Sequence, residues 1–295
     1  MLKSFVSVII PVYQNQEGLD RCLEALGKQT YPWERFEILV VNNDPLGEPV
    51  VRYPYKNLRV INEGKPGSYA ARNAGVRGSR GELLGFCDSD CIPDKHWIEN
   101  AMEIFASSKD TCILSGRVKL FFQDEHNLSY AEKYEKIFAF RQQEYARAGG
   151  AATANMFTRK DLFEEIGLFD ESLLSGGDLE WGQRAGSLGF PVGYSEKVLV
   201  GHPARSSVDL LEKKARRVVS GYIVLNRADF RKNPLNAVYH CISMLKPPLK
   251  AGQMIFSRKD FSLSDKVIVY FLDYYLKLVQ LSEFFRLQGG GGPRR

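Results

Sequence analysis

The sequence lacks the patterns that define several other classes of protein. Its five cysteines form no CxxC pair and no cluster with histidine at zinc-site spacing. An odd, scattered set of cysteines is typical of reduced thiols, so we expect a cytoplasmic protein. No internal repeat is present. The one low-complexity segment, GGGGPRR, predicts a flexible tail over 289–295.

A long uninterrupted apolar run is also missing. The most apolar C-terminal stretch, VIVYFLDYYLKLVQLSEFF from Val267, is interrupted by Asp273, Lys277 and Glu283. A membrane-spanning helix needs roughly 20 nearly uninterrupted apolar residues, so this stretch predicts an amphipathic helix instead. The N-terminal run MLKSFVSVIIPVY holds Pro11 and no small-residue cleavage site, which favours a buried first strand over a signal peptide.

Negative charge is scarce in the last third of the chain. Residues 1–204 hold 23 Lys+Arg and 28 Asp+Glu, a balance of −5, whereas residues 205–295 hold 17 and 7, a balance of +10. A basic tail on an acidic body indicates an anionic partner. Nucleic acid is disfavoured because no recognition-module signature accompanies the charge.

The basic tail predicts an amphipathic helical extension over 206–288. From Arg205 to Lys232 the chain holds 8 basic and 3 acidic residues, with apolar residues among them. This pattern is typical of helices that bind a membrane surface. A helical subdomain that covers the sheet, or a dimer interface, explains the same pattern, and both interpretations stay open.

The first two-thirds of the chain alternates short apolar runs with helical patterns. FVSVIIPV, FEILVVNND, LRVIN and ELLGFCD read as strands. The alternation predicts an α/β fold over 1–205, with a mostly parallel central sheet flanked by helices. Ligands of such sheets bind beyond the carboxyl ends of the strands. These ends carry polar residues that we expect to share one crevice: Asn42, Asn43, Asp88 and Asp90.

Beyond residue 95 the pattern becomes mixed. HWIENAMEIFA predicts a helix, TCILSGRVKLFF a strand and LSYAEKYEKIFAFRQQEYARA one long helix. We expect a loop, a strand and a short helix in GGAATANMFTRKDLFEEIGLFDE. A further helix follows SGGDLEW, and PVGYSEKVLVGH predicts a last strand.

Asp88 and Asp90 stand one residue apart, directly after the fourth apolar run. Two carboxylates this close repel each other unless a cation lies between them. Oxygen ligands of this type suit Mg²⁺ or Mn²⁺ bound together with substrate phosphates. Because Asp and Ser also build turns, DSD alone leaves a solvated turn equally open.

Five segments stand together in an order that is specific as a set. SVIIPVYQN, VVNND, GSYAARNAG, GFCDSDCIPD and GGDLEWGQRAGSLGF resemble the motifs of family 2 glycosyltransferases in order and spacing. The resemblance covers roughly residues 4–205. It implies a GT-A-type nucleotide-sugar-binding fold and an inverting, hexosyltransferase-type enzyme.

The resemblance assigns a first group of donor contacts. Pro11, Val12 and Tyr13 end the first strand, where the family's backbone and an aromatic ring border the nucleobase. Asn43 falls where the family usually has an aspartate that accepts a hydrogen bond from uracil. Because the side-chain carbonyl of asparagine also accepts, a UDP-sugar stays the favoured donor.

A second group is placed by the resemblance around the diphosphate. Lys65 and Arg72 fall where the family holds cationic groups close to the donor, although a solvated helix face also explains Arg72. Asp88 faces the ribose or the metal, Asp90 is the direct metal ligand, and Ser89 between them belongs to the donor site.

GGDLEWGQR supplies the catalytic base under the same resemblance. Asp178 aligns with the family's base, which removes the acceptor's proton, and Gly177 replaces the glutamate that commonly precedes it. Glu180 is the reserve candidate. Trp181 suits either the apolar face of a sugar ring or the protein core. From the local sequence alone, Asp178 also reads as the N-cap of a helix.

His202 completes the metal site that the resemblance implies. It ends a strand 24 residues after Asp178, where several GT-A enzymes have a third metal ligand. A lone histidine is usually structural. Since imidazole suits Mn²⁺ better than Mg²⁺, we expect one of these ions on Asp88, Asp90 and His202.

These residues together predict a metal-dependent inverting glycosyltransferase. One base and one displacement invert the anomeric centre, because retention by double displacement needs a second carboxylate as nucleophile. We expect a nucleotide-sugar donor and a saccharide or lipid-linked saccharide acceptor. The expected setting is polysaccharide or glycolipid assembly at the cytoplasmic face of a membrane, with homo-oligomers possible.

Two alternatives remain at this point. A nucleotidyltransferase also uses a nucleotide fold with acidic metal ligands, but PVYQNQEG stands where its glycine-rich loop with a lysine belongs. A non-catalytic sugar-nucleotide-binding or scaffold protein of an assembly complex is left open by Gly177 and the two asparagines.

Overall fold

The computed structural model describes residues 4–47, 49–53, 55–108 and 110–292. The chain divides into two compact units. One, called here the sheet unit, comprises Met1–Leu120, Phe140–Glu171 and Gly177–Pro203. The other, called the helical unit, comprises Phe121–Ala139, Ser172–Gly176 and Ala204–Arg295.

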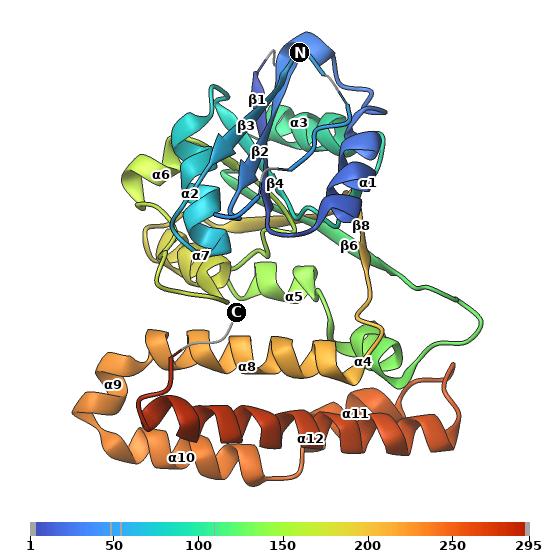
Figure 1. Ribbon diagram of the computed structural model, residues 1–295, viewed down its shortest axis with the longest axis vertical. Helices are drawn as coiled ribbons and strands as arrows, with labels where there is room; N and C mark the ends of the chain where they lie inside the picture. The colour runs from blue at the N-terminus through green and yellow to red at the C-terminus, as the bar shows by residue number, and fades with distance from the viewer. Residues whose placement is uncertain (1–3, 48, 54, 109, 293–295) are drawn as a thin grey trace. The chain divides into compact units, whose positions relative to one another are not determined.

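The sheet unit is built on an eight-stranded sheet with the order β3-β2-β1-β4-β7-β6-β8-β5. Figure 1 labels strands β1, β2, β3, β4, β6 and β8 of this sheet. Its first half is parallel and consists of β1 (Val6–Val12), β2 (Phe36–Asn42), β3 (Leu58–Asn62) and β4 (Leu83–Cys87). The sequence alternation therefore predicted these four strands and their direction correctly.

The second half of the sheet contains antiparallel pairs. Strand β7 (Asn155–Arg159) runs antiparallel to both β4 and β6 (Ile113–Phe121), and β5 (Ile92–Pro93) runs antiparallel to β8 (Val192–Pro203). The result is a mixed α/β fold, which confirms the expected class and adds an antiparallel half to the parallel one.

Helices surround this sheet. They are α1 (Gln16–Leu26), α2 (Ser68–Gly78), α3 (Trp97–Ser107), α5 (Gln142–Arg147), α6 (Leu162–Glu165) and α7 (Gly177–Ser187), with a 3₁₀ turn at Trp33–Arg35. Helix α1 begins where the side chain of Asn15 accepts a hydrogen bond from the amide of Gly18. Its apolar residues at helical spacing, Leu19, Cys22, Leu23 and Leu26, are all fully buried.

Asn155 joins four elements inside the core. Its side-chain oxygen accepts from the indole of Trp97 at 2.8 Å, and its amide nitrogen donates to the carbonyls of Arg117 at 2.8 Å and Val198 at 2.9 Å. Asn155 is fully buried, so these bonds replace the water that its amide would otherwise hold. A single polar side chain thus ties α3, β6 and β8 to β7.

The segment LSYAEKYEKIFAFRQQEYARA forms two helices, so the prediction of one long helix was wrong. Ser129 starts α4 (Tyr130–Phe138) with a capping box, and α5 starts again at Gln142. Between them Ala139 is extended and Phe140 has φ +47°. A left-handed residue cannot continue a right-handed helix, and local periodicity does not reveal it.

The helical unit holds α4 and five C-terminal helices. These are α8 (Val208–Leu225), α9 (Arg227–Lys232), α10 (Pro234–Leu245), α11 (Leu249–Phe256) and α12 (Leu263–Gln288). Apolar residues of α4, α8 and α12 form one buried cluster, in which Ala131, Leu211 and Leu276 meet. The expected helix from Val267 is confirmed as part of α12. Among the described helices, none is long and apolar enough to cross a membrane.

Two buried glutamates form ion pairs with basic residues of the tail. Glu135 accepts from Arg205 at 3.0 Å and from Lys214 at 2.9 Å, and its side chain is 1% exposed. Glu283, fully buried on α12, pairs with Arg286 at 2.5 Å and with Arg216 at 3.5 Å. These cations therefore stabilise the helical unit itself.

Candidate active site

The carboxyl ends of β1 and β2 lie side by side. Val12 is in register with Asn42, and the amide of Asn43 donates to the carbonyl of Val12 at 2.9 Å. Val12 is buried, Pro11 is half-buried, and Tyr13 is 44% exposed. The backbone and ring expected beside the nucleobase are thus at the end of the strand where the sequence predicted them.

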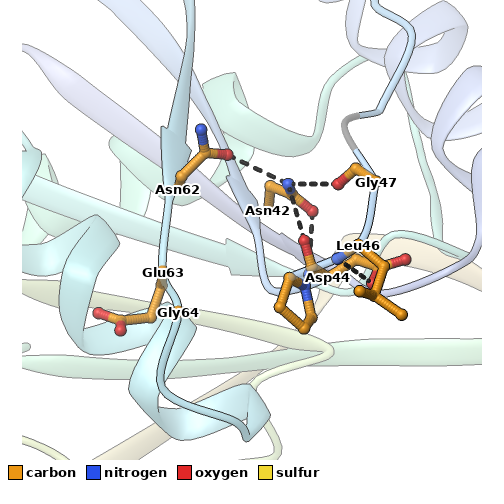
Figure 2. A pocket seen from close by; sticks show the side chains of 8 residues that line it. Asn42, Asp44, Leu46, Gly47, Asn62, Glu63 and Gly64 are labelled. Carbon is orange, nitrogen blue, oxygen red and sulfur yellow. Dashed lines mark hydrogen bonds between the residues drawn. The ribbon is translucent and has the colours of Figure 1, made fainter.

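A pocket of about 400 Å³ opens at the ends of β2 and β3 (Figure 2). Asn42 organises its wall, because its amide nitrogen donates to the carbonyl of Gly47 at 2.8 Å and to the side chain of Asn62 at 3.1 Å. Its oxygen accepts from the amide of Asp44 at 3.0 Å. Leu46, 91% exposed, lies on the rim.

Asn43 holds the neighbouring loop. Its amide nitrogen donates to the carbonyls of Glu63 at 2.9 Å and Lys65 at 2.7 Å, and its oxygen accepts from the amide of Gly67 at 2.8 Å. Gly67 has φ +128°, a conformation that favours glycine. The side chain assigned to base recognition therefore also shapes the turn that leads into α2.

Lys65 and Ser89 both contact protein groups. The Lys65 ammonium, 59% exposed, pairs with Glu171 at 2.5 Å, and its hydrogen bond is the largest cause that lowers the pKa of Glu171. Ser89 is buried, and its hydroxyl oxygen accepts a hydrogen bond from the side-chain Nδ2 of Asn15 at 3.2 Å.

Arg72 points to Asp88. Its guanidinium pairs with the Asp88 carboxylate and lies 5.5 Å from the centre of the Tyr69 ring. Arg72 is 5% exposed, so the alternative of a solvated helix face is excluded. Its buried Nε has no hydrogen-bond partner among the described residues. An unpaired, buried cationic donor beside a carboxylate is suited to an anionic ligand.

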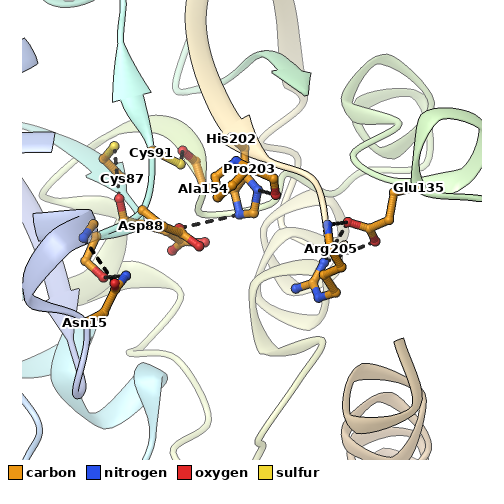
Figure 3. Close-up of polar contacts among 12 residues, drawn as sticks. Asn15, Cys87, Asp88, Cys91, Glu135, Ala154, His202, Pro203 and Arg205 are labelled. Carbon is orange, nitrogen blue, oxygen red and sulfur yellow. Dashed lines mark hydrogen bonds and ion pairs between the residues drawn. The ribbon is translucent and has the colours of Figure 1, made fainter. Parts of the chain in front are cut away.

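Asp90 and His202 form the centre of a candidate metal site. Figure 3 shows His202 and Cys91 in this region. His202 Nε2 lies 3.5 Å from Asp90 Oδ1. His202 Nδ1 lies 2.7 Å from the carbonyl oxygen of Pro203. Because a carbonyl only accepts, Nδ1 carries the proton, which directs the lone pair of Nε2 toward Asp90. Asp88 lies outside this cluster and contacts Arg72 instead.

Cys91 is the third member of the cluster, and the sequence analysis did not include it. The ligand atoms of Asp90, Cys91 and His202 all lie within 4.8 Å of one another. Burial raises the pKa of the Cys91 thiol to about 11. The thiol lies 3.6 Å from the carbonyl of Ala154 and donates to it. A metal ligand must be a thiolate, so these properties favour a structural thiol beside a site made by Asp90 and His202.

Asp178 is held at both of its carboxylate oxygens. Oδ1 accepts from the hydroxyl of Tyr69 at 3.0 Å and from the amide of Leu179 at 3.0 Å. Oδ2 accepts from the amide and hydroxyl of Thr153 at 3.0 and 3.3 Å. Helix α7 begins at Gly177, so Asp178 lies inside its first turn and not at the cap position. The carboxylate is only partly buried.

Glu180 and Trp181 serve the structure of α7. Both oxygens of Glu180 accept from Arg184, at 2.6 and 3.1 Å. Trp181 is fully buried, stacks on Phe163 with ring centres 4.7 Å apart, and donates to the carbonyl of Gly167 at 2.8 Å. Trp181 is therefore a core residue, and the alternative of a sugar-stacking ring is excluded. Asp178 is the stronger candidate for the base.

Comparison with known proteins gives the class of this fold. The structure matches the mannosyltransferase PcManGT from Pyrobaculum calidifontis, solved in complex with GDP-Man and Mn²⁺, with a TM-score of 0.66 at 15% identity, over 99% of this chain and 89% of that chain. It also matches S. aureus TarS 1-349 in complex with UDP-GlcNAc, with a TM-score of 0.51 at 17% identity, over 98% and 93%. The fold is of the GT-A type.

The sequence comparisons give the family. Residues 7–167 match the model of glycosyl transferase family 2. The chain is 36% identical to the glycosyltransferase AglE of Haloferax volcanii over 255 residues, 83% of each chain. It is 24% identical, over 70% of this chain and 68% of the other, to the dolichyl N-acetyl-alpha-D-glucosaminyl phosphate 3-beta-D-2,3-diacetamido-2,3-dideoxy-beta-D-glucuronosyltransferase of Methanococcus voltae. The chain belongs to glycosyltransferase family 2 and is an enzyme of that family.

Proposed function

We propose that this enzyme transfers a sugar, with inversion, from a UDP-sugar to a hydroxyl of a lipid-linked saccharide, with Mn²⁺ or Mg²⁺ at Asp90 and His202. The observation that carries the proposal is the placement of three groups within the sheet unit. Asp90 and His202 offer metal ligands, and Asp178 offers a partly exposed carboxylate. Buried Arg72 offers a donor, Nε, that has no partner within the described part of the chain. We further propose that residues 1–205 form the catalytic domain.

The donor set of the proposed metal site fits a divalent cation. Asp90 supplies oxygen and His202 supplies a correctly oriented nitrogen, with both atoms within reach of one ion. The lining of hard oxygen and borderline nitrogen suits Mn²⁺. When bound, the ion neutralises the charge of the departing diphosphate. Asp88 is the neighbouring carboxylate; it pairs with Arg72 and would contact the ribose or the ion.

The donor fits between the pocket and this site. Only β1 separates β2 from β4 in the sheet, so the pocket at the end of β2 lies roughly 10 Å from the residues that follow β4. A nucleoside diphosphate covers such a span. We place the base at the pocket bordered by Asn42, near Asn43, and the diphosphate beside Arg72, whose Nε would gain a partner that the described residues do not supply.

Asp178 is proposed to accept the proton of the attacking hydroxyl. The oxygen of that hydroxyl forms the new bond to the anomeric carbon while the bond to the diphosphate breaks. Glu180 is neutralised by Arg184 and does not offer a second nucleophile. One displacement with one base inverts the anomeric configuration.

The acceptor is proposed to reach the enzyme at a membrane surface, through α10. The exposed apolar residues of this helix follow helical spacing and share one face: Leu235, Val238, Tyr239, Ile242 and Leu245. Exposed cations stand at both ends of the helix: Arg227, Arg231, Lys232, Lys246 and Lys250. An apolar face between cations is complementary to a surface of anionic lipid. The free cysteines of the protein suit the cytoplasmic side of the membrane.

The proposal is tested by calorimetric titration of UDP and of GDP, each with and without Mn²⁺. We expect metal-dependent binding of UDP that is lost in Asp90→Ala. Preference for GDP would correct the base while keeping the site. Absence of binding to a folded protein would refute the metal site.

Turnover is tested separately with Asp178→Asn. We expect loss of transfer with nearly unchanged UDP binding, because the amide cannot accept a proton at neutral pH. Glu164→Gln, which changes an exposed glutamate of α6, is the matched control and should retain full activity. Full activity of Asp178→Asn would refute Asp178 as the catalytic base.

A further inference from the structure

Gly177 and Tyr69 fit together beside the proposed base. A Cβ at Gly177 would lie 2.9 Å from Cε2, 3.0 Å from Cδ2 and 3.1 Å from Cζ of the Tyr69 ring. Such distances are too short for any side chain at 177 unless the ring moves. The glycine that departs from the expected glutamate is therefore the residue that leaves room for an aromatic ring packed against the start of α7.

Tyr69 is fixed on its other sides as well. It is 4% exposed, its ring centre lies 5.8 Å from that of Phe169, and the Arg72 guanidinium lies 5.5 Å from the ring centre. Burial, with the adjacent Asp178 carboxylate, raises the pKa of Tyr69 far above its usual range. The hydroxyl therefore stays protonated and can only donate to Asp178.

We propose that Tyr69 is a positioning residue for the transfer reaction, which orients Asp178 so that Oδ2 takes the proton of the acceptor hydroxyl. Oδ1 already accepts from Tyr69 and from the amide of Leu179. The weakest bond of the carboxylate is the one from the Thr153 hydroxyl to Oδ2, at 3.3 Å. Oδ2 is therefore the oxygen whose partner an incoming hydroxyl can replace. This inference rests on the proposed function.

Tyr69 also connects the two halves of the reaction. Its hydroxyl donates a hydrogen bond to the proposed base, Asp178. Its ring lies under the Arg72 guanidinium, which pairs with Asp88. The base and the cation of the donor site thus share one rigid support. A shift of the ring would displace both groups, whereas loss of the hydroxyl alone would release only the base.

Tyr69→Phe separates these roles because it removes the hydroxyl and keeps the ring. We expect kcat to fall about 10- to 100-fold, as for loss of one hydrogen bond to a charged group, with UDP affinity unchanged. We also expect the acid limb of the pH profile of kcat/KM to move to higher pH, since the carboxylate loses a donor that favours its ionised form. Tyr55→Phe, which removes a hydroxyl bonded to the Leu23 carbonyl, is the matched control.

Gly177→Ala provides an independent second variant. It should reduce kcat and weaken UDP binding together, because the displaced ring packs against the Arg72 guanidinium. In a protein that already has Tyr69→Ala, the added methyl group should have almost no further effect. Wild-type kcat and pH profile in Tyr69→Phe would overturn the positioning role if Asp178→Asn is inactive. An active Asp178→Asn would instead overturn the proposed base, so the two failures are distinguishable.

Discussion

Glu135→Gln should destabilise the helical unit strongly. The Glu135 side chain is 1% exposed and receives Arg205 and Lys214, whose side chains are 22% and 33% exposed. The glutamine keeps the volume but leaves two partly buried cations without a counter-charge. Removing one partner of a buried pair costs about 3–5 kcal/mol, and the residual exposure of the cations reduces our expectation to about 2–4 kcal/mol.

The pH dependence of this effect has a definite sign. Burial alone would raise the pKa of Glu135, but Lys214 and Arg205 outweigh it, and the pKa is lowered from 4.5. The stabilisation is therefore complete above pH 4.5 and is lost as the pH falls through the lower pKa of the folded state. The pKa of Lys214 is also lowered, because burial and Arg205 outweigh the attraction of Glu135.

The free energy of unfolding of the wild type and of Glu135→Gln is measured at pH 7 and at pH 3 by urea titration, with circular dichroism as the signal. Glu17→Gln is the control, since Glu17 is 85% exposed and pairs with Arg21 at 3.3 Å, a surface arrangement worth about 0–1 kcal/mol. We expect a large gap between the two variants at pH 7 that narrows at pH 3. Equal losses in the two variants at pH 7 would refute the reasoning.

Three further predictions concern the core, the donor and the membrane. Asn155→Ala leaves one indole and two carbonyl groups unpaired in the core, and should cost about 3 kcal/mol in chemical unfolding; a cost below 1 kcal/mol would contradict the role of this residue. Arg72→Lys keeps the charge but not the fork of donors, so the Kd for UDP with Mn²⁺ should rise about 10-fold by calorimetry, and an unchanged Kd would place the diphosphate elsewhere. Leu235→Ser combined with Tyr239→Ser should abolish sedimentation of the protein with vesicles of anionic lipid. The control Leu46→Ser, which changes a 91% exposed residue of the sheet unit, should sediment like the wild type. Equal sedimentation of the two variants would exclude α10 as the contact.

Local patterns explain why the fold was predictable. Short apolar runs that end at Asn42 and Asp88 are signals within single segments, and parallel pairing places such ends at one edge of a sheet. The same patterns placed His202 at the end of a strand. The structure brings Asp90 and His202 within reach of one ion, while their role as ligands stays a prediction.

Contacts between distant segments explain what was not predictable. Tyr69 and Asp178 are 109 residues apart, and nothing near either residue indicates their hydrogen bond. The left-handed turn at Phe140 interrupts a helical pattern without a glycine or proline to mark it. Buried Glu135 neutralises cations that the sequence shows only as excess charge. Each of these features depends on packing, which a one-dimensional pattern does not contain.

The loop from Asp44 to Gly47 is held by the Asp44 carboxylate within it and by a residue outside it. Asn42 ties down its backbone at both ends, and the side chain of Leu46 takes no part in that support. Mutation at Leu46 can therefore change the lining of the pocket while the backbone keeps its course. In evolution this position can diversify at little cost to folding, and in the laboratory a library at Leu46 is where a search for altered donor choice should begin.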